Sequence, residues 1–165
     1  MKAALACVLA IVGLLSVWWS VQALRRQYRL GPGDFRPTFH TALESALPAQ
    51  LPHSIVFLQA MRLHAAGDVD VWVAAKVPQN DIALLQNQFG TFDQAYGSMI
   101  LLGAESLLHP KREYTLADMD FVGSSRWGSC AVLPIKDGWQ EVIFYTGNNR
   151  PGQKDSANAL YDQFH

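Results

Sequence analysis

The chain opens with one long apolar stretch and continues with shorter segments in which apolar and polar residues alternate. No charged residue lies between Ala3 and Leu24, and a helix of about 20 such residues spans the hydrocarbon core of a bilayer. Tryptophans near the end of such a stretch, followed by arginines, are typical of the membrane–water boundary. The pattern predicts an N-terminal transmembrane anchor over residues 1–29 that contacts the membrane through residues 3–24. Its predicted membrane-interface residues are Trp18, Trp19, Arg25 and Arg26.

A secretory signal peptide is the alternative interpretation of this leader. The residues at Val21 and Ala23 resemble a signal-peptidase site, and cleavage after Ala23 would release a mature chain. The apolar stretch, however, is longer than a usual signal-peptide core and carries two tryptophans close to the cut. We therefore expect an uncleaved, single-pass anchor.

Two opposing signals bear on the orientation of this anchor. Three arginines closely follow the apolar stretch and only Lys2 precedes it, which favours a cytoplasmic domain by the positive-inside rule. A leader this close to the N-terminus, however, normally acts as an export signal. We expect an extracytoplasmic domain, with a secreted chain or a cytoplasm-facing domain as the alternatives.

The remaining residues, 30–165, carry the periodicities of one small globular domain. Phe39, Leu43 and Leu47 recur every four residues, which predicts a first helix, capped by Asp34. A second helix is predicted over about 81–89 and a short final helix over 156–164. The stretch 91–127 gives no clear pattern, because 96–108 is apolar but interrupted by glycines and 109–127 is polar.

Residues from about 55 to 77 predict a first β-hairpin. A five-residue loop would place apolar residues opposite one another on one face and Arg62 opposite Asp70 on the other. A shift by one residue would set Leu63 against Asp70 and Arg62 against a valine, which mixes charged and apolar partners. We therefore expect the five-residue loop. Trp72 falls on the second face, so we expect that face to be covered by a helix or a neighbouring strand.

Residues from about 129 to 146 predict a second hairpin, which turns at Asp137 and the glycine that follows it. This turn sets Leu133 opposite Val142 on the core face. Pro134 has no amide donor for a ladder, which indicates an edge strand or a bulge. The order of elements predicts an α+β fold, in which an antiparallel sheet built from the two hairpins has two to three helices packed on one side.

Charge and cysteine content exclude some functions. Fourteen acidic and nine basic residues lie beyond Leu30, so this part of the chain carries a net charge of −5. Binding to nucleic acid relies on basic residues that neutralise phosphates, and we set this class aside. Cys7 lies in the leader and Cys130 is alone in the domain, so no disulfide can form within the domain.

Candidate catalytic and metal-binding residues are few. Papain-like proteases have Gly-Ser-Cys at their nucleophile, but here a strand pattern follows Cys130 instead of a helix. A nucleophilic thiol also needs a partner that lowers its pKa, and the sequence places no histidine beside it. Two Asp-x-Asp pairs, at 68–70 and 118–120, lack the further oxygen ligands of a calcium loop, and the histidines lack zinc-site spacing. We expect no catalytic, cofactor-binding or metal site.

Aromatic residues and an arginine concentrate in the second half of the domain. Tryptophan, tyrosine and arginine are the usual anchors of protein interfaces, so Arg126, Trp127 and Trp139 are candidate interaction anchors. Together with the leader, they predict a membrane-tethered, non-catalytic interaction or accessory domain whose partner is a protein of the cell envelope. The alternative is a small apolar-ligand-binding protein or enzyme that uses an aromatic pocket between sheet and helices.

Overall fold

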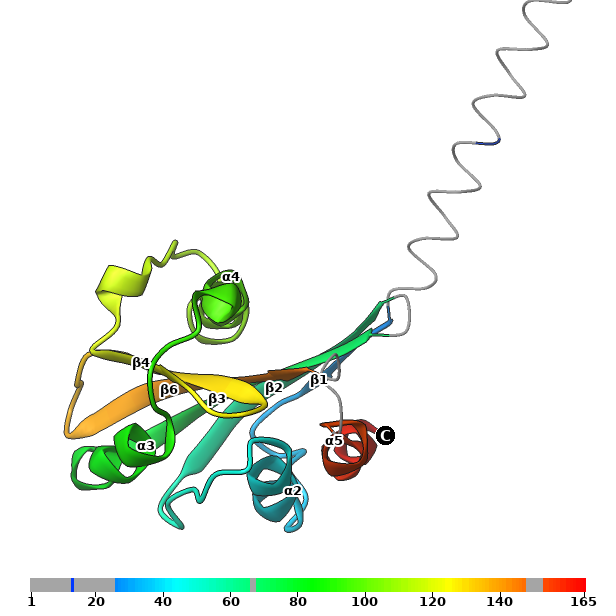
Figure 1. Cartoon of the computed structure of the whole chain (residues 1–165), viewed down its shortest axis with the longest axis horizontal. Helices are drawn as coiled ribbons and strands as arrows, with labels where there is room; N and C mark the ends of the chain where they lie inside the picture. The colour runs from blue at the N-terminus through cyan, green and yellow to red at the C-terminus, as the bar shows by residue number, and fades with distance from the viewer. Residues whose placement is uncertain (1–12, 14–25, 66–67, 148–152) are drawn as a thin grey trace, which may run out of the picture.

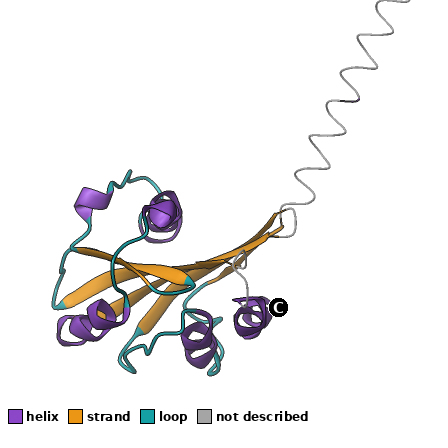
Figure 2. Cartoon of the chain, viewed as in Figure 1, coloured by secondary structure: helices purple, strands orange, loops and turns teal. Residues whose placement is uncertain are grey.

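A single antiparallel sheet runs through the computed structural model, which describes residues 13, 26–65, 68–147 and 153–165 (Figures 1 and 2). The six strands lie in the order β1-β2-β3-β6-β5-β4. The α+β class with an antiparallel sheet is therefore confirmed. The strands are β1 (Arg26–Leu30), β2 (Val56–Ala65), β3 (Asp68–Pro78), β4 (Phe121–Ser124), β5 (Gly128–Val132) and β6 (Trp139–Gly147).

Helices cover both faces of this sheet, which corrects the expectation that they pack on one side (Figure 1). The reason lies in β3, where Val71 and Val73 are buried on one face and Trp72 and Ala74 on the other. A strand that is apolar on both sides needs a covering layer on both sides. The helices of the first face are α2 (Phe39–Ala46), α3 (Ile82–Gln88) and α5 (Gln153–Tyr161), and those of the second are α4 (Gly97–Gly103) and its π-helical continuation η3 (Ala104–Leu108).

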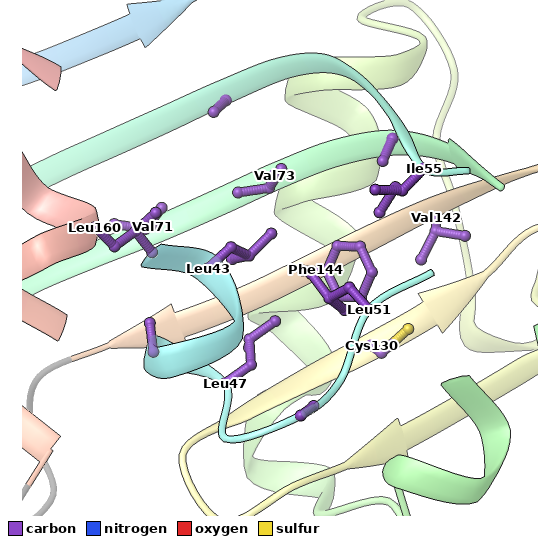
Figure 3. Close-up of a cluster of buried hydrophobic side chains, with 14 of the residues drawn as sticks. Leu43, Leu47, Leu51, Ile55, Val71, Val73, Cys130, Val142, Phe144 and Leu160 are labelled. Carbon is purple, nitrogen blue, oxygen red and sulfur yellow. The ribbon is translucent and has the colours of Figure 1, made fainter. Parts of the chain in front are cut away.

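The larger core lies between the sheet and the helices of the first face. The row of apolar residues in α2 that the four-residue spacing predicted is fully buried there. Asp34 does not cap this helix, because its carboxylate accepts a hydrogen bond from the Gly31 amide (2.7 Å) and closes a turn ahead of it. Figure 3 shows side chains of this core from α2, the strands and α5, among them Leu43, Leu47, Val71, Val73, Cys130, Val142, Phe144 and Leu160.

The pairing of β2 with β3 corrects the predicted register. Next to the turn, Leu63 lies opposite Asp70 and Arg62 opposite Val71, which is the arrangement that we considered unfavourable. An irregularity between Phe57 and Gln59 shifts the register by one residue further along the strands. The five-residue loop is therefore wrong, because β2 continues to residue 65 and β3 begins at residue 68.

The covering layers explain why this register is tolerated. Arg62 Nη1 donates a hydrogen bond to the carbonyl of Tyr161 in α5 (3.1 Å), and the guanidinium carbon lies 5.1 Å from the centre of the Tyr28 ring. Asp70 accepts a hydrogen bond from the Tyr145 hydroxyl (2.6 Å). Each charged residue thus finds its partner in a neighbouring strand or helix, and the predicted pair between Arg62 and Asp70 is not needed.

The connection between β5 and β6 contains the predicted turn together with a register shift. Asp137 and the glycine after it have φ angles of 54° and 79°, as a two-residue turn of the primed type requires. Within the sheet, however, Val142 lies opposite Val132 and not opposite Leu133. Pro134, which has no amide donor, lies between β5 and the turn, in an irregular stretch that has one residue more than the facing part of β6.

The sheet begins earlier in the chain than the predicted domain boundary. β1 pairs with β2 from Arg26 onward, with Arg26 opposite His64. Among the described residues, no helix is long and apolar enough to cross a bilayer. Apart from Gly13, the predicted membrane span lies outside the described residues, and so do the cleavage site after Ala23 and the interface residues Trp18, Trp19 and Arg25.

Candidate interaction site

The structure does not bring the three predicted anchors together. Arg126 and Trp127 lie side by side before β5, with the guanidinium carbon 5.0 Å from the indole ring centre. The residue after Trp127 pairs with Thr146 near the end of β6, whereas Trp139 begins that strand. At about 3.3 Å per residue, the two sites are roughly 23 Å apart along β6.

Trp127 and Trp139 also differ in how they are held. Trp127 is half-buried, and its carbonyl accepts a hydrogen bond from Thr146 Oγ1 (3.0 Å). Trp139 belongs to the turn between β5 and β6, where its backbone exchanges two hydrogen bonds with Lys136 (2.8 and 3.0 Å) while its side chain is 38% exposed. Trp139 is therefore the better candidate for an interaction anchor.

The two ends of the sheet differ in their relation to the leader. β1 begins at Arg26, shortly after the apolar stretch of the leader ends at Leu24, and we call this the leader-proximal end. At the opposite, leader-distal end, Val56 lies opposite Lys76 and Lys76 lies opposite Glu141. β3 runs from one end to the other over 11 residues, which corresponds to about 33 Å.

Exposed apolar side chains gather at the leader-distal end. Val56 is 48% exposed and Ile135 is 46% exposed, and both lie at the same end of the sheet as Trp139. Among the described residues only one other large hydrophobic side chain, Leu102 of α4, is exposed to this extent. Grouped exposed apolar residues with a polar rim are typical of interaction sites. We call the group the distal surface and define it as Val56, Lys76, Ile135, Trp139 and Glu141.

A cleft with a volume of about 550 Å³ adjoins the distal surface. One wall comes from the chain that follows η3, which the sequence pattern left without an assigned structure, and the other from the connection between β5 and β6. We call it the Tyr114 cleft. It is lined by His109, Arg112, Tyr114, Asp118, Leu133, Pro134, Ile135, Lys136 and Glu141.

The acidic side chains of the cleft have partners within the chain. The Glu141 carboxylate lies 3.1 Å from His109 Nε2. The Asp118 carboxylate accepts hydrogen bonds from the backbone amide and the hydroxyl of Thr115 (2.7 and 2.8 Å), and these bonds lower the pKa of Asp118. Arg112 Nη2 is 3.8 Å from the other Asp118 oxygen. The carboxylates are therefore already engaged.

Tyr114 is among the residues that line the cleft and is only 4% exposed. The guanidinium carbon of Arg112 lies 4.7 Å from the centre of its ring. Burial raises the pKa of the Tyr114 phenol, Arg112 lowers it, and the carboxylates of Glu141 and Asp118 raise it further. The phenol oxygen has no hydrogen-bond partner among the residues that the structure describes.

Cys130 and most of the Asp-x-Asp residues, which were considered as catalytic or metal-binding candidates, are buried or bonded within the chain. Cys130 is fully buried in the larger core, and burial raises the pKa of its thiol, which makes the thiolate scarce. Of the Asp-x-Asp residues, Asp70 bonds to Tyr145 and Asp120 accepts from Gln140 Nε2 (3.0 Å). Within the described ranges, no group of three or more His, Cys, Asp or Glu side chains is arranged to hold a metal ion.

The aromatic residues between the sheet and α4 are closely packed. Trp72 is fully buried, its indole nitrogen donates to the carbonyl of Met99 in α4 (2.7 Å), and its ring centre lies 5.4 Å from that of Tyr145. A side-chain carbon added at Gly103 would lie 2.6 Å from Trp72 Cδ1. This packing gives no support to an aromatic ligand pocket between sheet and helix.

Comparisons with protein-family models, with curated proteins and with solved structures find no match to this chain. Its function is therefore inferred from the arrangement of its own residues. The distal surface and the Tyr114 cleft are the most informative arrangement, because they combine exposed apolar, charged and incompletely bonded groups at one place.

Proposed function

We propose that this protein is a membrane-tethered, extracytoplasmic interaction domain without catalytic activity, and that it docks an envelope protein on its distal surface. The observation that carries the proposal is the grouping of Val56, Ile135 and Trp139 at the end of the sheet away from the leader. A leader held in the membrane keeps the leader-proximal end close to the bilayer. The distal surface then lies about 33 Å further from the bilayer than the leader-proximal end, and a protein partner can reach it there.

The chemistry of the distal surface suits a protein partner. A tryptophan held by a rigid turn binds with a small loss of conformational freedom, and the backbone bonds between Trp139 and Lys136 hold it in this way. The exposed Ile135 and Val56 supply apolar area around it, while Lys76 and Glu141 supply charged groups at the rim. Apolar anchors inside a polar rim are the usual anatomy of a protein interface.

Site-specific cross-linking in living cells tests the proposal. A photo-cross-linking amino acid replaces Ile135, and a matched control carries it at Gln86, an exposed position on α3 over the opposite face. We expect one discrete adduct from position 135, with the same protein identified in each replicate, and its loss when Trp139→Ala is added. Adducts of equal yield from both positions, or none from position 135, would overturn the docking proposal.

Protease protection tests the tether and the orientation. A C-terminally tagged chain is treated with an impermeant protease in spheroplasts, and its intact mass is measured in the same sample. Digestion of a full-mass protein that sediments with membranes supports an anchored extracytoplasmic domain. Protection of the full-mass chain would identify a cytoplasm-facing domain, and a shortened chain in the soluble fraction would identify a cleaved signal peptide.

A further inference from the structure

We draw no further inference here: the strongest candidate, the cleft that Glu44 of α2 and Leu84 of α3 line together with His53, Ser54 and Asp81, has two carboxylates and no lysine or arginine among its described lining residues, but it rests on these acidic side chains alone and nothing in the structure shows what occupies it.

Discussion

Gly103→Ala tests how α4 packs on the sheet. The added carbon would lie 2.6 Å from Trp72 Cδ1 and 3.0 Å from Ile143 Cγ2, closer than side-chain carbons normally approach. Trp72 cannot easily withdraw, because it is fully buried and its indole nitrogen is bonded to the Met99 carbonyl. Overpacking of this kind costs about 1–3 kcal/mol, while replacing a helical glycine with alanine returns at most about 1 kcal/mol. We expect a net loss of about 1–2 kcal/mol in the free energy of unfolding.

Urea unfolding of the full chain in detergent, followed by tryptophan fluorescence, measures this loss. Gly97→Ala is a matched control in the same helix, because its added carbon would lie 3.5 Å from Leu116 Cδ1, an ordinary contact. We expect this control to be neutral or slightly stabilising. If Gly103→Ala were as stable as Gly97→Ala, the close contact between α4 and Trp72 would be refuted.

Three further predictions address the site and the charges. Tyr114→Phe should leave the free energy of unfolding unchanged or raise it by about 1 kcal/mol in urea, because it removes a buried hydroxyl without a partner. Burial raises the pKa of Asp70 above its ordinary value of 3.8. The folded state therefore binds the proton more readily, and the stability contributed by this group increases as the pH falls through the raised pKa toward that ordinary value. Lowering the pH from 7 to about 4 should therefore raise the urea midpoint of the wild type relative to that of Asp70→Asn. Trp139→Ala should abolish the cross-link from Ile135 while lowering the unfolding free energy by no more than about 2 kcal/mol, because the residue is 38% exposed and belongs to neither core cluster.

The sequence predicted the elements that have strong local signals. The row of Phe39, Leu43 and Leu47 identified α2, because four-residue spacing places all three on the face that the sheet buries. The turn at Asp137 was identified because the glycine after it can adopt positive φ. The register of the flanking strands was not predictable in the same way, because single-residue irregularities near Leu58 and Pro134 shift it.

Other elements depend on packing that no local pattern reveals. β1 and β4 are short, and the polar residues in both give little strand signal. Gly103 suggested an interrupted helix, whereas its lack of a side chain is what lets α4 approach Trp72. No local pattern distinguishes the exposed Val56 and Ile135 from buried strand residues, because their exposure depends on how far the covering helices extend. Of the predicted anchors, only Trp139 belongs to the distal surface.

The most direct test of the central claim is the labelling of single cysteines with an impermeant maleimide in spheroplasts. Ile135→Cys and Gln86→Cys are compared in a Cys7→Ser chain, where the remaining Cys130 is buried. The account predicts that Gln86→Cys is labelled rapidly and Ile135→Cys slowly, and that adding Trp139→Ala speeds the labelling of position 135. Equal labelling of both positions would contradict docking on the distal surface, and no labelling of either before lysis would contradict an extracytoplasmic domain.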